Sequence, residues 1–76
     1  MPPLEILVDA RGHRCPVPTL RLRRALEQAP PGAHIRLLAD DPLARIDVPH
    51  FAGQAGVRLI DQADVDGALS FLVAKD

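Results

Sequence analysis

Aromatic residues and cysteine are scarce in this chain of 76 residues. It has no Trp, no Tyr, two Phe and a single cysteine, Cys15. With only two rings the core must be aliphatic, and recognition of nucleic acid by stacking bases on aromatic side chains is excluded. One cysteine cannot form an internal disulfide, so its thiol matters as a nucleophile, a carrier or a ligand.

Long apolar runs are also missing. No run approaches the roughly 18 to 20 residues of a membrane span, and Met1-Pro2-Pro3-Leu4-Glu5 has no basic region followed by an apolar stretch. A single unpaired cysteine fits a reducing compartment. We therefore expect one cytoplasmic domain, residues 1–76, with no signal peptide and no membrane association.

Acidic residues are absent from one stretch, between Asp9 and Glu27. That stretch holds five of the chain's cationic residues, Arg11, Arg14, Arg21, Arg23 and Arg24. It contributes +5 to a net charge of −1, and it contains the thiol. Such a stretch can steer an acidic partner toward Cys15, or it can be an ordinary solvated helix face. A direct nucleic-acid role is not expected, since the isoelectric point is about 6.2.

Hydrophobic periodicity predicts the order β-α-β-α-β-β. We expect strands over Leu4–Val8, Ala33–Ala39, Val57–Asp61 and Ala68–Ala74, and a helix over Pro16–Gln28. Pro49 should interrupt a continuous helix, so we expect two short helical pieces instead, Pro42–Ile46 and Pro49–Ala55. Asp66-Gly67 indicates a hairpin. These elements predict an α+β fold, a two-layer α/β sandwich in which both helices cover one face of a four-stranded mixed sheet.

The thiol stands in Cys15-Pro16-Val17-Pro18, at the predicted start of the first helix. Only the thiolate is a useful nucleophile, and a helix N-terminus lowers a thiol pKa. If Cys15 is the N-cap, Pro16 takes the first helical position and the Val17 amide is left to face the sulfur. Pro18 disfavours the helical conformation for Val17, so the helix can instead begin at Pro18. The helix start and the nearby cations are thus two features that can lower the thiol pKa, and in the second version Cys15 lies two residues before the helix.

Several neighbours can assist the thiol. Arg11 and Arg14 add positive potential, and His13 is either a proton shuttle or a solvated loop residue. Leu20 falls on the polar side of the helix, one turn from the thiol, where it is either an ordinary exposed residue or part of a docking surface. A zinc site is not expected, because Cys15 and the three histidines show no recognised spacing. A Cys-His-acid hydrolase is not expected either, since so small a domain hardly builds a substrate pocket.

The run from Asp9 to Pro18, Asp-Ala-Arg-Gly-His-Arg-Cys-Pro-Val-Pro, resembles the signature of the TusA-type sulfur carrier family. Asp40-Asp41-Pro42 and Asp47-Val48-Pro49 resemble two further marks of that family. The resemblance covers about Leu4 to Lys75. His13 departs from it, since many members carry an apolar residue there, and no second cysteine is available as a resolving thiol.

The resemblance implies the same fold and a relay rather than a stand-alone enzyme. Cys15 would accept sulfur as a persulfide from a donor protein, a desulfurase or a rhodanese-like protein. It would pass the sulfur to an acceptor protein in tRNA thiolation, molybdenum cofactor assembly or sulfur oxidation. No metal or organic cofactor is implied, and we expect a monomer. The residues expected to support the persulfide or bind partners are Arg11, His13, Arg14, Pro16, Val17, Pro18 and Leu20. The alternatives are a non-catalytic regulatory interaction module and a peroxide-sensing thiol.

Overall fold

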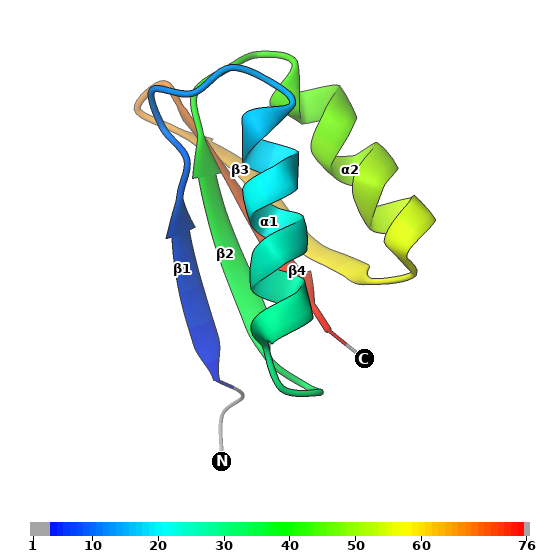
Figure 1. Cartoon of the computed structure of the whole chain (residues 1–76). Helices are drawn as coiled ribbons and strands as arrows, with labels where there is room; N and C mark the ends of the chain where they lie inside the picture. The colour runs from blue at the N-terminus through cyan, green and yellow to red at the C-terminus, as the bar shows by residue number, and fades with distance from the viewer. Residues whose placement is uncertain (1–3, 76) are drawn as a thin grey trace.

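The computed structural model describes residues 4–75, and its six elements follow the predicted order β-α-β-α-β-β. Residues 1–3, on which the expectation of no signal peptide partly rests, and residue 76 lie outside the described residues. The elements are β1 (Glu5–Asp9), α1 (Val17–Gln28), β2 (His34–Ala39), α2 (Ala44–Ala55), β3 (Arg58–Val65) and β4 (Ala68–Ala74) (Figure 1).

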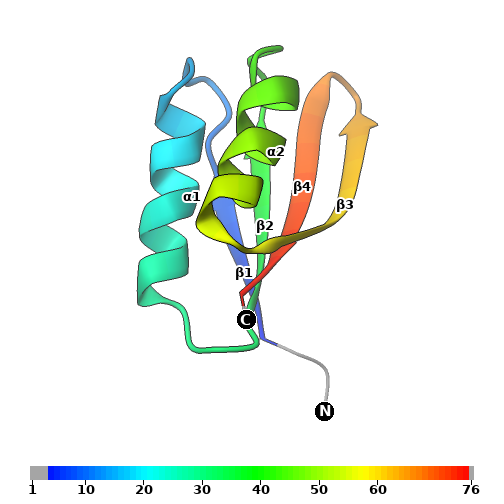
Figure 2. The same ribbon diagram turned by 90° about the vertical axis from the view of Figure 1, so that its right-hand side faces the viewer.

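The four strands form one mixed sheet in the order β1-β2-β4-β3. β1 and β2 are parallel because α1 connects them as a crossover, whereas β4 runs antiparallel to both of its neighbours. Figure 2 shows both helices on the same face of the sheet, so the predicted two-layer arrangement is confirmed. Asp66 and Gly67 both have positive φ, 52° and 81°, as a two-residue hairpin turn requires, which confirms the predicted hairpin.

The core lies between the sheet and the two helices. Alternate residues of β2 and β4 point into it, and α1 contributes every third or fourth residue, as its helical periodicity predicts. Its largest fully buried side chains are Phe71, Leu22, Ile35, Leu37, Val48, Val73 and Pro18. Apart from Phe71 the largest members are aliphatic, as the composition requires.

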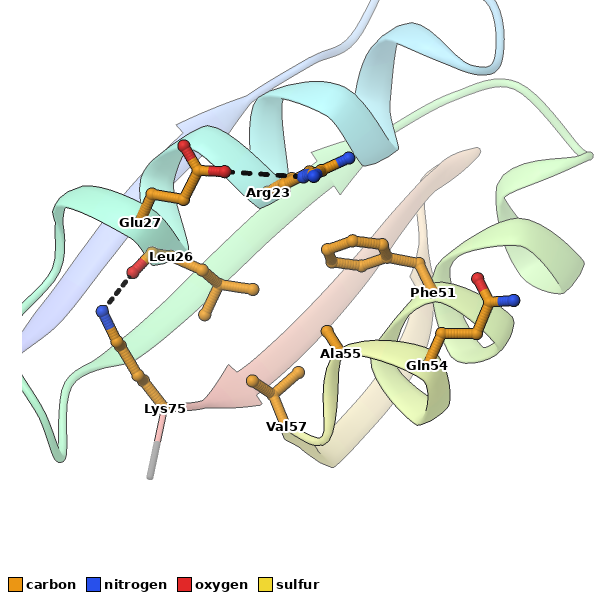
Figure 3. A pocket seen from close by; sticks show the side chains of 8 residues that line it. All are labelled: Arg23, Leu26, Glu27, Phe51, Gln54, Ala55, Val57 and Lys75. Atoms are coloured by element: carbon orange, nitrogen blue, oxygen red, sulfur yellow. Dashed lines mark hydrogen bonds and ion pairs between the residues drawn. The ribbon is translucent and has the colours of Figure 1, made fainter.

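The C-terminal end of α1 is closed by Lys75, which follows β4. Its ammonium donates hydrogen bonds to the carbonyls of Leu26, at 2.5 Å, and Ala29, at 2.7 Å. The first of these bonds is drawn in Figure 3. The last carbonyls of a helix have no partner within the helix and carry partial negative charge, so a cation stabilises them. This contact joins α1 to the end of the sheet.

The prediction of two helical pieces separated at Pro49 is wrong, because α2 is one helix with Pro49 inside it. A proline in a helix interior leaves the carbonyl four residues earlier, here that of Arg45, without an amide partner and costs about 3 kcal/mol. Arg45 is exposed, so water can hydrate this carbonyl. Ala44, Val48 and Ala52 lie one turn apart and are all buried, and their packing holds the helix together.

Two boundaries differ from the prediction by more than one residue. α2 begins at Ala44 rather than Pro42, because Pro42 and Leu43 form a turn before it. β3 runs on to Val65 instead of ending at Asp61, since an irregularity between Leu59 and Asp61 lets it stay paired with β4 up to the hairpin. Neither helix among residues 4–75 has the length and apolarity needed to cross a membrane.

Candidate functional site

Cys15 lies at the end of the molecule where both helices begin. The loop over residues 10–16 leaves β1 and enters α1, and the turn after β2 enters α2 at the same end (Figures 1 and 2). The two connections enclose an open depression, which we term the thiol hollow. It is lined by Gly12, His13, Arg14, Cys15, Asp40, Asp41, Pro42 and Leu43. The fold thus brings the cysteine motif beside the Asp-Asp-Pro segment.

Two adjacent aspartates hold the cysteine loop in place. The Asp40 carboxylate accepts the Gly12 amide, 3.0 Å from each of its oxygens. Gly12 has a φ of +84°, a conformation that glycine adopts without strain. The Asp41 carboxylate accepts the Cys15 amide at 2.9 Å and the Leu43 amide at 3.0 Å. These two amides hold the pKa of Asp41 below its usual value.

Asp41 therefore links the thiol loop to the turn that starts α2. Asp41 stands just before α2, and its carboxylate accepts the amide of Leu43, the N-cap residue of that helix. Its contact with Cys15 has no local signal, because the two residues are 26 positions apart. An Asp-Asp pair immediately after a buried strand is the one feature that marks the place.

The Arg11 side chain pairs with the carboxylate of Asp9 rather than with Asp40 or Asp41. Its guanidinium and its amide both donate to Asp9, at 2.8–3.1 Å, and hold the pKa of Asp9 at about 2. Arg21 donates to the Asp9 carbonyl oxygen at 2.8 Å, which fastens α1 to the end of β1. The cation expected to favour the thiolate thus neutralises Asp9 instead.

The start of α1 differs from both predicted versions. Pro16 is the N-cap, Val17 is the first helical residue despite the proline after it, and the peptide bond between Cys15 and Pro16 is cis. The Val17 amide, expected to face the sulfur, donates to the Arg14 carbonyl at 2.9 Å. The first helical bond runs from the Leu20 amide to the Pro16 carbonyl, at 3.0 Å. The Val17 amide is therefore used inside the loop and does not stabilise a thiolate.

The thiol itself is half-buried against the core. Burial raises the pKa of Cys15 to about 11, with further contributions from a hydrogen bond to Asp47 and from the negative charges of Asp41 and Asp47. The prediction of a lowered thiol pKa is therefore wrong. The two carboxylates that contribute to the raised pKa, those of Asp41 and Asp47, come from the α2 side, whereas the Arg11 side chain is paired with Asp9. In the sequence, Asp47 stands out only as part of Asp47-Val48-Pro49, one of the marks of the family resemblance.

The other predicted site residues separate into surface and core. His13, Arg14, Pro16, Val17 and Leu20 are exposed around the cysteine. Pro18 is fully buried at the start of α1, so it packs in the core and offers no exposed surface to a partner. Among residues 4–75, no three His, Cys, Asp or Glu side chains are grouped as a metal site would need.

Comparison with known proteins points in one direction. Residues 6–75 match the family described as Sulfurtransferase TusA. The chain is 34% identical over 68 residues to the sulfur carrier protein TusA of Allochromatium vinosum, covering 90% of each chain. It is 31% identical over 74 residues to that of Pseudomonas fluorescens, covering 97% of this chain and 89% of the relative. A crystal structure of a SirA-like protein from Desulfitobacterium hafniense superposes with a TM-score of 0.81 at 27% identity, covering 91% and 95% of the two chains.

Proposed function

The chain belongs to the sulfurtransferase TusA family, and we propose that Cys15 carries sulfur as a persulfide from a donor protein to an acceptor protein. The observation that carries the proposal is the position of the sole cysteine, at the edge of an open hollow between two helix starts. The family match and the relatives named as sulfur carriers support it. The chain acts as a relay and needs two partners.

The transfer conserves atoms and electrons. The Cys15 sulfur gives up its proton and attacks the outer sulfur of a donor cysteine persulfide. A new S–S bond forms at Cys15, the S–S bond of the donor breaks, and the donor cysteine leaves as a thiolate that is reprotonated. Sulfane sulfur has moved and nothing has been oxidised overall. A nucleophilic acceptor then takes the terminal sulfur and returns Cys15 to a thiol.

The anchored loop suits repeated docking. The Cys15 amide is fixed by Asp41, Gly12 is fixed by Asp40, and Pro16 stiffens the chain next to the sulfur. A surface that is ordered before binding loses less conformational entropy in each encounter. The exposed residues His13, Arg14, Val17 and Leu20 surround the thiol, and we place the first contacts with partners there.

The donor class that fits is a cysteine desulfurase or a rhodanese-like protein, because each presents sulfur as a protein-bound persulfide. The acceptor then belongs to tRNA thiolation, molybdenum cofactor assembly or sulfur oxidation. Because a cysteine that cycles between thiol and persulfide needs a reducing environment, we propose the cytoplasm as the site of this activity.

Intact mass spectrometry tests the proposal directly. The chain is incubated with a cysteine desulfurase and cysteine, and Cys15→Ser is treated in parallel. We expect the wild type to gain the mass of one sulfur atom, reversibly on adding dithiothreitol, and the variant to gain none. A Cys15→Ser protein that still relays sulfur refutes the proposal. A Cys15→Ser protein that keeps its full cellular role instead favours a regulatory interaction module.

A further inference from the structure

Exposed apolar side chains gather at the end of the molecule that carries the thiol. Among residues 4–75 eight large apolar side chains are exposed, and four of them belong to the two helix starts. These four are Val17 (36% exposed), Leu20 (55%), Leu43 (56%) and Ile46 (69%). Single exposed apolar residues are ordinary, whereas several at the two helix starts beside the cysteine loop favour an interaction surface at this end of the molecule.

The position of the thiol decides what a partner must cover. In the proposed transfer the donor sulfur must come within bonding distance of the Cys15 sulfur, and an S–S bond is about 2 Å long. Cys15 is half-buried in the thiol hollow, whose opposite wall is formed by Asp41, Pro42 and Leu43. A protein that reaches the sulfur therefore lies over the start of α2 as well as the start of α1.

The area of an ordinary protein–protein interface also implies that a partner covers the starts of both helices. A stable complex buries about 800 Å² on each partner, and the whole chain exposes 4735 Å². About one sixth of the surface is then covered, which is most of one end of a molecule measuring 32 × 24 × 17 Å. Leu43 lines the hollow and Ile46 is the third residue of α2.

Charge defines the chemistry of the partner. Arg14 and Arg24 are exposed and enter no ion pair among the described residues. The nearby carboxylates of Asp40 and Asp41 are occupied by backbone amides. The α1 side of the surface thus offers free positive charge, whereas the α2 side offers the apolar side chains of Leu43 and Ile46.

We propose that the docking surface for the sulfur donor protein has two halves, one on each side of the thiol hollow. Val17 and Leu20 form the half on α1, and Leu43 and Ile46 form the half at the start of α2. The donor presents apolar side chains to the start of α2 and carboxylates to Arg14 and Arg24. This inference rests on the proposed function and assigns to α2 a part in it.

A second hollow, lined by both apolar and charged side chains, lies too far from the thiol to be the docking site. It lies between the C-terminal halves of α1 and α2, where Leu26, Phe51 and Val57 form its apolar side (Figure 3). Leu26 is nine residues along α1 from Val17, a rise of about 14 Å. A protein seated only there does not reach the thiol.

Two sulfur donors of different size test the docking surface. A cysteine desulfurase with cysteine must dock, whereas inorganic polysulfide reaches Cys15 without docking. Sulfur on Cys15 is measured by intact mass against the concentration of this chain for wild type, Leu43→Asn, Ile46→Asn and Ile46→Leu. Asparagine removes the apolar contact without adding negative charge near the thiol. Ile60→Asn is the matched control, because Ile60 is 45% exposed on β3. Circular dichroism verifies that each variant is folded.

We expect both asparagine variants to raise the KM of the desulfurase for this chain at least tenfold, with polysulfide loading unchanged. Ile46→Leu and Ile60→Asn should match the wild type with both donors. Wild-type KM values in Leu43→Asn and Ile46→Asn overturn the docking surface. Equal losses with both donors also overturn it, because the defect then lies in the thiol. A wild-type chain that neither donor loads refutes the proposed function itself. A wild-type chain that takes sulfur from polysulfide, but from neither a desulfurase nor a rhodanese-like protein, shows that a sulfur donor protein is not the partner that binds this surface.

Discussion

Replacing Asp47 by Asn tests what keeps the Cys15 thiol protonated. Burial is the largest cause of the raised pKa, the hydrogen bond to Asp47 comes next, and the charges of Asp41 and then Asp47 follow. Asparagine keeps the shape of the side chain and removes its charge, whereas burial and the charge of Asp41 remain. The thiol pKa should therefore fall from about 11 toward the usual value of 9.0 without reaching it.

The size of the effect follows from two opposing factors. Lowering the thiol pKa by one unit raises the thiolate fraction at pH 8 about tenfold, and the lower basicity makes each thiolate about threefold less nucleophilic. Alkylation at pH 8 should then be roughly three to four times faster for each unit by which the pKa falls. If Asp47→Asn removed the whole shift of two units, the gain would be about thirteenfold, which is an upper limit.

The assay is alkylation by iodoacetamide, followed by intact mass from pH 7 to pH 11.5. We expect the midpoint of the rate profile to move to lower pH in Asp47→Asn. Asp61→Asn removes an exposed carboxylate from β3 and should leave the profile unchanged. A midpoint that stays at the wild-type pH, or moves upward, contradicts the assignment of Asp47 as a partner of the thiol.

Three further predictions concern stability. The pKa of Asp9 is about 2 in the folded chain and 3.8 in the unfolded chain, so the contribution of Asp9 to folding stability is present above pH 3.8 and is lost as the pH falls toward 2. Arg11→Gln should therefore flatten this part of a plot of Tm against pH. Above pH 9 the Cys15 thiol ionises more readily in the unfolded chain, so denaturant titrations should show stability falling between pH 9 and pH 11 in the wild type but not in Cys15→Ser. Phe71→Ala should lower the free energy of unfolding by about 3–5 kcal/mol, because Phe71 is fully buried, and a loss below 1 kcal/mol in urea titrations would contradict its central place in the core.

Local patterns predicted most of the fold. The alternation in β2 and β4, the stripe of α1 and the Asp66-Gly67 turn each depend on neighbouring residues, and each is confirmed. The prediction failed at Pro49, where the burial of one face of α2 outweighs a local rule. Such packing is a tertiary effect, and the local sequence does not contain it.

The environment of the site was less predictable than the fold. The cysteine motif identified the right loop, but the state of the thiol depends on contacts between distant segments. Asp40 and Asp41 lie 28 and 26 residues from the amides they bind in that loop. The sequence neighbours of Cys15 are cations and a helix start, which favour a lowered pKa. The carboxylates that help to raise the pKa come from distant positions, so the direction could not be predicted from these neighbours.

The raised thiol pKa and the proposed docking surface together separate two steps of sulfur transfer. A thiol with a pKa of about 11 is about 0.01% ionised at pH 7, so the free chain reacts slowly with small electrophiles. Docking supplies proximity, which makes transfer from a bound persulfide effectively unimolecular. Asp47→Asn should then change the reactivity of the free thiol with little effect on the KM of the donor for this chain, and Ile46→Asn should do the reverse. If one variant changed both quantities, the thiol and the start of α2 would act as one unit, and the division of labour argued for the two sides of the hollow would be wrong.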